Sequence, residues 1–370
     1  MRIRLLVDSG EFCRRLKEDV DAARGYVFAQ ALSFEGDAAG QGMAELLLSC
    51  GAPDRRVLID SFTRHVVNDR FLWTPRNLLD RGLRAEARET RRMIDRLRSR
   101  GVAVRFTNPA GPLFMRFPAR NHKKLVAIDG RVAYLGGINF SDHNFLWHDL
   151  MLRIEDPDLV GFLREDFEST WNGRHRKARQ AFPGIVLHSL DGASNEDAFA
   201  PVLALIDGAR ESLYVECPYL TSPFCGRLAE ARRRGVAVTV VTPERNNWGL
   251  CRDAMVWHAA RSGFDVRFYR DRMTHMKAML VDGRVLVVGS ANFDVWSYRF
   301  QQEFLACVTD GKVIEDFRKR VMEEDLRRSA PCGVALGSVA GRLTELKLAA
   351  LDRLSAFWRW VLPSAGVSGS

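Results

Sequence analysis

Two histidine–lysine pairs are the residues of this sequence best suited to chemistry. His122 and Lys124 reappear as His275 and Lys277, each 153 residues later. A histidine titrates near neutral pH, so its imidazole can attack as a nucleophile or exchange a proton. An ammonium group beside it can stabilise the charge of phosphoryl oxygens. These residue types suit exchange at a phosphodiester, which needs a nucleophile, a proton donor and cations.

The same offset relates a wider set of residues, so the pairs belong to an internal repeat. The further matches are Asp129 with Asp282, Gly136 with Gly289, Asn139 with Asn292, and Phe140 with Phe293. The chain has 8 lysines against 47 arginines, and lysines at matching positions indicate a need for a compact ammonium group. A single His-x-Lys pair is more often a solvated surface pair. A repeat that duplicates charged groups, instead of apolar core residues, indicates a function.

Each histidine–lysine pair stands at the start of two apolar stretches joined by Asp-Gly. The stretches are KKLVAID and RVAYLGG in the first copy, and MKAMLVD and RVLVVGS in the second. Asp-Gly between apolar stretches predicts a β-hairpin. Because side chains alternate along a strand, the histidine and the lysine of each copy should share one face.

Around these hairpins, short apolar strands alternate with helical stretches in both halves of the chain, which predicts an α/β fold. We expect strands at 26–32, 57–59 and 102–106 with helices at 43–48 and 85–98, then strands at 213–216, 236–241 and 266–269 with helices at 228–234 and 254–260. The expected division is a first half at 1–182, a linker at 183–198, a second half at 199–330 and a C-terminal amphipathic helical tail at 331–370.

The composition is that of a folded protein with an excess of positive charge. Of 370 residues, 46% are hydrophobic and 27% are charged, and the net charge is +9. Residues 61–100 alone contain eleven arginines and five acids. This concentration favours an anionic partner, either nucleic acid or acidic lipid.

The cysteines and the apolar segments indicate the cellular compartment in which we expect the protein. Seven scattered cysteines without a CxxC pair argue against a disulfide framework and a structural zinc site, so a reducing cytoplasm is expected. The first residues lack the apolar core of a secretory signal, and no segment approaches about 18 consecutive apolar residues. We therefore expect the protein to meet a bilayer only from its surface.

The two motifs resemble a known superfamily. HKKLVAID and HMKAMLVD match the HxKxxxxD motif of the phospholipase D superfamily, and GGINFSD and GSANFD match its companion motif. Within it, RNHKKLVAIDGRVAYLGGINFSD and GSANFDVWSYRFQQEF look most like bacterial cardiolipin synthases and related phosphatidyltransferases. The resemblance implies an α/β fold of two similar halves, with mixed β-sheets flanked by helices, a pseudo-twofold axis and an active site between the halves.

The resemblance also implies roles for individual residues. One histidine forms a phosphohistidine and the other protonates the leaving alcohol; we assign His122 as nucleophile and His275 as acid, although the residues alone would allow the reverse. The remaining expected site residues are Lys124 and Lys277 for charge, Asn139, Asn292 and Ser290 for phosphate oxygens, Asp129 and Asp282 for ordering the hairpins and lysines, and Glu303 and Asp149 for orienting an imidazole. The lysines supply the positive charge, so we expect neither a metal nor another cofactor.

Two positions depart from the cardiolipin synthase pattern. Trp296 stands where an arginine is usual, and Gln301 stands where an asparagine is usual. Phosphohistidine chemistry should survive both changes. The choice of head group or acceptor is where we expect them to act.

The substrate has to be argued from other segments, because nucleases share these motifs. Leu113, Phe114, Met115 and Phe117 lie in a proline-bounded loop just before His122, which suits acyl chains, although packing beneath the loop would explain them equally well. The C-terminal tail has the composition of an interfacial helix, with expected membrane contacts at Leu354, Phe357, Trp358 and Trp360, and 71–73 is a weaker second anchor. An amphipathic helix docked on the core is the alternative.

The sequence thus predicts a peripheral phosphatidyltransferase on the cytoplasmic face of the cell membrane. The expected reaction forms cardiolipin from phosphatidylglycerol, an anionic phospholipid, and releases glycerol. The alternatives are a phospholipase D that yields phosphatidic acid, or a nuclease, although nucleic acid is the less expected partner. An inactive lipid-binding scaffold would need a broken motif, and both motifs are intact. The oligomeric state is left open.

Overall fold

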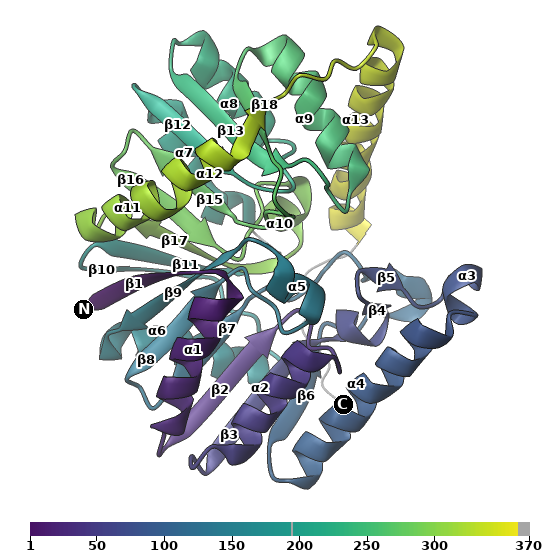
Figure 1. Ribbon diagram of the computed structural model, residues 1–370, viewed down its shortest axis with the longest axis vertical. Coiled ribbons are helices and arrows are strands. Elements are labelled where there is room, and N and C mark those ends of the chain that lie inside the picture. The colour runs from purple at the N-terminus through teal and green to yellow at the C-terminus, as the bar shows by residue number, and fades with distance from the viewer. Residues whose placement is uncertain (194, 362–370) are drawn as a thin grey trace. The chain divides into compact units, whose positions relative to one another are not determined.

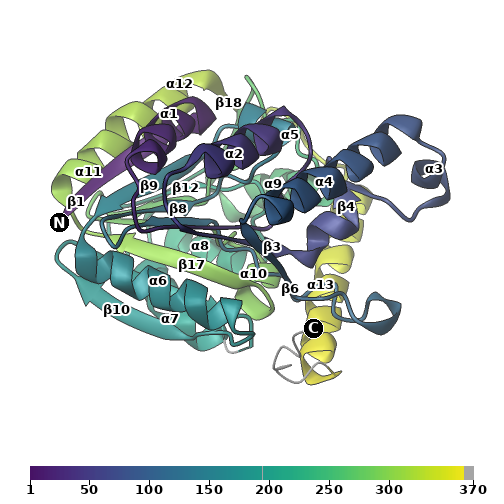
Figure 2. The ribbon, with the colours of Figure 1, turned by 90° about the horizontal axis from the view of Figure 1, so that it is seen from below.

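The computed structural model describes residues 1–193 and 195–361, without the side chains of 359–361. The chain forms two compact units. Of the described residues, the first contains Met1–Leu146 and Leu150–Arg176, and the second contains Trp147–Asp149 and Lys177–Val361. In each unit a central sheet is covered by helices (Figures 1 and 2).

The first unit is built on a seven-stranded mixed sheet in the order β1-β9-β8-β7-β2-β3-β6. Its strands are β1 (Arg2–Val7), β2 (Tyr26–Ala31), β3 (Asp54–Asp60), β6 (Ala103–Thr107), β7 (Leu125–Ile128), β8 (Val132–Gly136) and β9 (Leu150–Glu155). Strands β2, β3 and β6 run parallel, and the other neighbours pair antiparallel. A separate two-stranded sheet joins β4 (Val66–Val67) and β5 (Arg70–Phe71).

The second unit repeats this arrangement in a nine-stranded sheet, β10-β11-β17-β16-β15-β12-β13-β14-β18. Its strands are β10 (Ala178–Phe182), β11 (Ile185–Asp191), β12 (Ser212–Glu216), β13 (Ala237–Pro243), β14 (Asp265–Tyr269), β15 (Ala278–Val281), β16 (Val285–Gly289), β17 (Gln302–Val308) and β18 (Ser329–Pro331). The central order β17-β16-β15-β12-β13-β14 matches β9-β8-β7-β2-β3-β6. The predicted α/β class with two similar mixed-sheet halves is confirmed.

Helices cover the sheets because their apolar residues lie on one stripe. In the first unit they are α1 (Asp8–Asp21), α2 (Ala38–Ser49), α3 (Pro75–Leu78), α4 (Arg81–Ser99), α5 (Asp142–Leu146) and α6 (Pro157–Trp171). In the second they are α7 (Asn195–Gly208), α8 (Phe224–Arg233), α9 (Gly249–Ser262), α10 (Val295–Arg299), α11 (Gly311–Phe317), α12 (Glu323–Arg328) and α13 (Ser338–Val361). Helices α1, α2 and α4 share one core with their sheet, and α7, α8 and α9 share the other.

Local signals set the starts of two of these helices. The Asp80 side chain accepts a hydrogen bond from Leu83 N at 3.0 Å and so caps α4. Asp156 caps α6 in the same way through Leu159 N, also at 3.0 Å, and Pro157 occupies the first turn. A capping acid satisfies an amide that has no partner within the helix.

The structure differs from the sequence prediction at the expected linker. Residues 183–198 include all of β11, which pairs with β17, and the start of α7. Of the residues that suggested a linker, Gly192 lies in the turn between these two elements, whereas Ser189 and Asp191 belong to β11. The segment is therefore largely part of the second sheet and its helical cover.

The C-terminal tail contains α13, one side of which packs on α9 and α10. Gly341 lies against the Trp257 ring, and Arg299 pairs with Asp352 at 3.1 Å. Within the described residues, none of the helices combines the length and the apolar character that a bilayer span requires.

The repeated glycines of the two motifs are explained by close backbone contact. A Cβ atom on Gly136 would overlap the Leu150 carbonyl oxygen, and one on Gly289 would overlap the Phe304 carbonyl oxygen. In both copies the glycine ends the second hairpin strand beside the next strand of the sheet. The repeat therefore preserves a steric requirement as well as chemical groups.

We predict that Gly289→Ala lowers the free energy of unfolding by about 1–3 kcal/mol, because the methyl group forces a shift of packed backbone. Thermal denaturation followed by circular dichroism measures this. The matched control is Gly161→Ala in α6, where a Cβ meets no atom within 4 Å. That variant should gain about 0.5–1 kcal/mol from helix propensity. Equal melting temperatures for the two variants would contradict the steric explanation.

Candidate active site

The first histidine–lysine pair lies on the extended segment just before β7. His122 and Lys124 are buried, with 6% and 1% of their surface exposed. The Lys124 ammonium donates to the His122 carbonyl oxygen at 2.7 Å. Lys123 between them is held by both carboxylate oxygens of Asp166 on α6, at 2.8 Å each. Alternation along the segment thus gives the motif lysine and its neighbour different partners.

A buried carboxylate fixes the backbone immediately before His122. Asp60, at the end of β3, accepts from Asn121 N at 2.5 Å and from the Arg120 guanidinium at 2.9 Å. Complete burial raises the pKa of Asp60 to about 6, and the Arg120 charge opposes that shift. The Asn121 side chain accepts from Gln30 on β2 at 2.8 Å. The neighbouring parallel strands therefore position the histidine.

Asn139, the residue of the first unit expected to bind phosphate, already makes hydrogen bonds to other residues of that unit. Asn139 accepts from Ser33 N at 3.3 Å and donates to the Asn144 side chain at 3.2 Å. An amide nitrogen carries two protons. One N–H of Asn139 is therefore left for a further acceptor after these contacts.

The second histidine–lysine pair has a carboxylate beside the imidazole. Asp149 Oδ2 lies 2.7 Å from Nδ1 of His275, and Lys277 Nζ lies 2.8 Å from the same nitrogen. Because the carboxylate can only accept, its bond with Nδ1 requires the tautomer that carries the proton there, and in that tautomer the Lys277 ammonium cannot donate to the same nitrogen. The Lys277 ammonium also donates to the His275 carbonyl oxygen. Burial lowers the pKa of Lys277, and the Asp149 carboxylate opposes that shift.

Asp149 reaches this position because the segment 147–149 folds with the second unit. His148 N donates to the Met273 carbonyl oxygen at 2.8 Å, and His275 N donates to the His148 carbonyl oxygen at 2.7 Å. These bonds place the segment parallel to residues 273–275. The structure therefore brings together Asp149 and His275, two of the residues expected from the sequence.

Aromatic rings around His275 were not expected from the sequence. The Trp147 ring centroid lies 4.8 Å from that of His275, and the Tyr219 centroid lies 6.1 Å away at a steep angle. Tyr219 donates to the Asn247 side chain at 2.6 Å and lies edge-on to Trp248. The sequence signal was the position of Trp147, two residues before an expected orienting acid.

Glu303 and Ser290 form one buried network. The Ser290 hydroxyl donates to Glu303 and accepts from Phe304 N at 3.0 Å. Ser297 also donates to Glu303, at 2.9 Å, and its hydroxyl accepts from Asn292 N at 3.1 Å. Ser290, expected at phosphate oxygens, thus holds a carboxylate.

The companion motif also includes an unsatisfied amide oxygen. The Asn292 side-chain oxygen is buried without a hydrogen-bond partner among the described residues. Of the two departures from the family pattern, Gln301 has its side-chain oxygen 3.2 Å from the Ser297 hydroxyl, and Trp296 lies beside Phe300.

The motif aspartates lie at the far end of their strands. Asp129 accepts from the backbone N–H groups of residues 24–26 at 2.7–2.8 Å, and Asp282 accepts from those of 210–212 at 2.8–3.2 Å. Despite the opposing effect of burial, these donors lower the pKa of both carboxyls. Each lies seven positions along an extended segment from its histidine, which is roughly 20 Å. In the described part of the chain, neither bonds to Lys124 or Lys277, so the expectation that they order the lysines is corrected.

Two groups of side chains bring potential metal ligands within 4.8 Å of one another in the part of the chain described. They are His148, Glu216 and Asp325, and Glu35, Asp37 and Glu86. Neither contains a motif histidine or lysine. Burial and the Asp325 charge raise the pKa of Glu216 well above its usual value, so a proton can neutralise that carboxyl.

The duplicated fold and the duplicated HxKxxxxD motif are those of the phospholipase D superfamily. The chain belongs to the family described as "Cardiolipin synthase, PLD-like domain", whose model matches residues 56–171 and 202–325. The resemblance seen in the sequence is thereby confirmed.

Among curated proteins, the chain is 26% identical to a probable cardiolipin synthase, YwiE, of Bacillus subtilis, over 87% of this chain and 66% of that protein. It is 26% identical to cardiolipin synthase A of Pseudomonas aeruginosa, over 84% of this chain and 64% of that protein. The chain thus spans about two thirds of the length of these relatives.

Two solved structures share the fold. A phosphatidylserine synthase of Haemophilus influenzae superposes with a TM-score of 0.69 at 16% identity, over 97% of this chain and 95% of that one. A polyphosphate kinase of Porphyromonas gingivalis gives 0.61 at 13% identity, over 95% of this chain and 53% of that one. At these identities the likeness concerns the fold alone.

We predict that Asp149→Asn lowers the rate of phosphodiester turnover by about 10²–10⁴-fold, because an amide no longer fixes the tautomer of His275. The pH–rate profile should also shift, which a purely structural role would not produce. Asp253→Asn, at a partly exposed position on α9 of the same unit, is the control and should be unaffected. An unchanged rate and profile for Asp149→Asn would refute the orienting role.

We predict the opposite pattern for Asp129→Asn. Loss of the carboxylate that gathers three backbone donors should lower stability by about 1–2 kcal/mol. The turnover rate per folded molecule should stay within about twofold, because the residue lies far from the imidazole. Denaturant titration and steady-state kinetics on the same preparation separate the two effects.

Proposed function

We propose that this protein is a phosphatidyltransferase that forms cardiolipin from two molecules of phosphatidylglycerol and releases glycerol. The observation that carries the proposal is the duplicated buried His-x-Lys segment, with a carboxylate on Nδ1 of His275. Membership of the cardiolipin synthase domain family supports the lipid substrate.

The proposed first step is attack by Nε2 of His122 on the phosphorus of one phosphatidylglycerol. A P–N bond forms, the P–O bond to the head-group glycerol breaks, and the leaving oxygen takes a proton from Nε2 of His275. Asp149 stabilises the protonated imidazole before transfer and keeps Nδ1 protonated afterwards.

In the second step, the head-group hydroxyl of another phosphatidylglycerol returns a proton to His275 and attacks phosphorus. The P–N bond breaks and cardiolipin is released. This proposal requires that both imidazoles act on one phosphorus atom. Lys124 and Lys277 would stabilise the charge on the phosphoryl oxygens, since buried ammonium groups act most strongly where water is excluded.

A lipid substrate is supported by the apolar loop that precedes His122. Leu113 is 92% exposed, and Phe114 and Met115 are about two-fifths exposed. Phe114 and Phe117 both pack edge-on against Phe71, so part of the loop serves the alternative role as packing. Exposed apolar side chains beside a catalytic segment suit acyl chains and a membrane surface better than a polyanion.

The exposed side of α13 supports attachment to a membrane surface. Leu354 and Phe357 are 55% and 60% exposed, and Trp358 is half-buried. The Trp360 side chain, also expected to touch the membrane, lies outside the described residues. We propose a peripheral position on the inner face of the cell membrane, with α13 anchored to the protein by its packed side.

The reaction is tested with phosphatidylglycerol vesicles. We expect cardiolipin and glycerol as the main products, and loss of turnover by about 10³-fold or more in His122→Ala and in His275→Ala, because the two act as one unit. EDTA should leave the rate unchanged, because the lysines supply the charge.

The product ratio decides between this proposal and its alternatives. Phosphatidic acid as the main product would make the protein a phospholipase D. Cleavage of single-stranded DNA without lipid turnover would make it a nuclease.

Membrane attachment is tested by Leu354→Ser with Phe357→Ser. Each exposed apolar side chain should contribute on the order of 1 kcal/mol at an interface, so the double variant should sediment with anionic vesicles about 30-fold less tightly at an unchanged melting temperature. Val339→Ser, at an 80% exposed position near the start of α13, is the control. Undiminished sedimentation of the double variant would show that α13 is not the anchor.

A further inference from the structure

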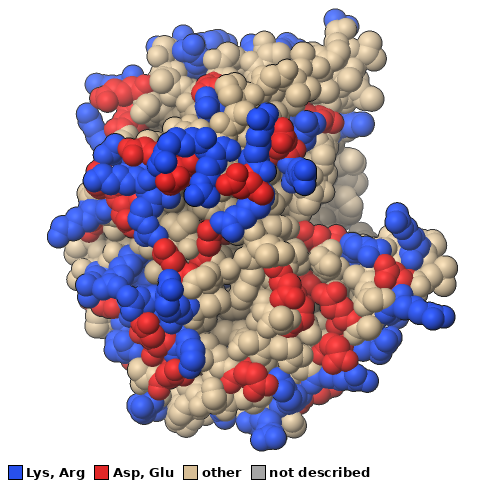
Figure 3. All heavy atoms as spheres, viewed as in Figure 1, with Lys and Arg blue, Asp and Glu red and all other residues tan. Residues whose placement is uncertain are grey.

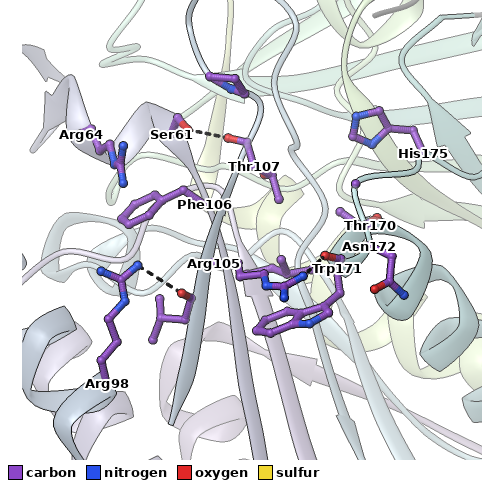
Figure 4. A pocket seen from close by; sticks show the side chains of 14 residues that line it. Ser61, Arg64, Arg98, Arg105, Phe106, Thr107, Thr170, Trp171, Asn172 and His175 are labelled. Atoms are coloured by element: carbon purple, nitrogen blue, oxygen red, sulfur yellow. Dashed lines mark hydrogen bonds between the residues drawn. The ribbon is translucent and has the colours of Figure 1, made fainter. Parts of the chain in front are cut away.

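A second group of residues suited to a phosphate ligand lies around β6, the edge strand of the first sheet. A pocket with a volume of about 570 Å³ is lined there by Arg64, Arg98, Arg105, Thr107, Thr170 and Trp171, among others. Figure 4 shows these side chains on both sides of the strand. None of them belongs to the histidine–lysine motifs or their supporting residues.

Two arginines in the pocket lack acidic partners. The Arg64 guanidinium lies 3.9 Å from the centroid of the Phe106 ring, and that of Arg98 lies 5.9 Å from it. Within the described residues neither forms an ion pair. Arg96 on the same helix, by contrast, pairs with Glu45 at 2.6 Å. Burial and the positive charges of Arg98 and Arg91 lower the pKa of Arg64, as expected where like charges gather.

A third arginine is fixed in place without being neutralised. Arg105 donates to the Trp171 carbonyl oxygen at 2.7 Å and lies 4.6 Å from the Trp171 ring centroid. It too has no carboxylate partner in the described part of the chain. Ion pairs elsewhere on this surface are common, and on the face in Figure 3 basic and acidic side chains are interleaved. Other arginines of α4, among them Arg88 and Arg91, also have no ion pair in the described part of the chain, so what marks the pocket is the gathering of three such arginines around it.

Two buried hydroxyl groups in the pocket have no hydrogen-bond partner. Thr107 and Thr170 are 5% and 3% exposed, and the Oγ1 atom of each makes no hydrogen bond among the described residues. The neighbouring Ser61 hydroxyl, in contrast, donates to the Thr107 carbonyl oxygen at 2.6 Å. An unsatisfied buried hydroxyl is costly. A phosphate oxygen would accept from it.

An apolar pocket adjoins the basic one. It has a volume of about 440 Å³ and shares Arg64, Arg98 and Phe106 with the first pocket. Its other lining includes the apolar residues Leu72, Trp73, Ala87 and Ile94, together with the polar residues Thr63, His65, Thr90, Arg91 and Asp95. The shared arginines therefore separate a region with phosphate-binding groups from a region that suits hydrocarbon.

We propose that these two adjoining pockets bind an anionic phospholipid, with its phosphate at Arg64, Arg98 and Thr107 and an acyl chain beside Leu72 and Ile94. This site is separate from the residues proposed for phosphodiester exchange. Free phosphate would leave the apolar pocket unused. The proposal does not depend on the reaction catalysed, because binding is measured without turnover.

The probe is dihexanoyl phosphatidic acid below its micelle concentration, titrated into the full chain by calorimetry. Arg64→Gln with Arg98→Gln should weaken binding by tenfold or more, because hydrogen bonds to charged groups are strong. Thr107→Val should weaken it about threefold to tenfold, at an equal or higher melting temperature because the unsatisfied hydroxyl is removed. The matched control is Thr242→Val, which removes another buried, unpartnered hydroxyl, in the second unit.

Further titrations with other ligands and variants each test one part of the proposal. Dihexanoyl phosphatidylcholine should bind at least tenfold more weakly, and inorganic phosphate should bind weakly but through the same arginines. Equal affinity for phosphate and lipid would overturn the lipid assignment. Loss of binding in His122→Ala but not in the pocket variants would place the probe in the exchange site and overturn the proposal. If the double arginine variant does not fold, Thr107→Val decides alone.

Discussion

The rest of the structure depends on keeping ammonium and imidazole groups buried while they remain usable. Lys124 and Lys277 are each 1% exposed, and an isolated charge in that environment is strongly disfavoured. Each is held by the carbonyl oxygen of its own motif histidine, two residues earlier. The local backbone therefore has to be extended, and the sheet around it has to fix that backbone.

Several features of both units serve this requirement. Asp60 ties the backbone before His122 to β3, and the bonds of the segment 147–149 tie the backbone at His275. At the far end of the hairpins, Asp129 and Asp282 fasten the turns to the strands beside them. Gly136 and Gly289 let the next strand approach closely. The motif residues thus divide into those near the imidazole and those that hold the hairpin carrying it.

Much of this was predictable because the repeat and the turn residues are local signals. The Asp-Gly turns, the hairpins and the alternation of strands and helices follow from spacing along the chain, and the structure has them. Side-chain partners that are distant in sequence could not be predicted in this way. Asp149 was a candidate for orienting an imidazole, but spacing alone could not assign it to His275. Nor could a count of arginines in 61–100 show that Arg96 is paired while Arg64 and Arg98 are not. Those distinctions depend on which side chains the packed sheet brings together.

The place of the segment 147–149 means that the repeat in the sequence and the unit in space do not coincide. By sequence the segment follows the first motif, yet it folds with the second unit and supplies the carboxylate of His275. A gene fragment cut between the two repeats would encode one imidazole without its acid. If the halves arose by duplication, they could not diverge independently. A substitution at Asp149, which follows the first motif in the sequence, changes the surroundings of His275 in the second motif. The unit that the sequence repeats is therefore not the unit that brings an imidazole together with its carboxylate.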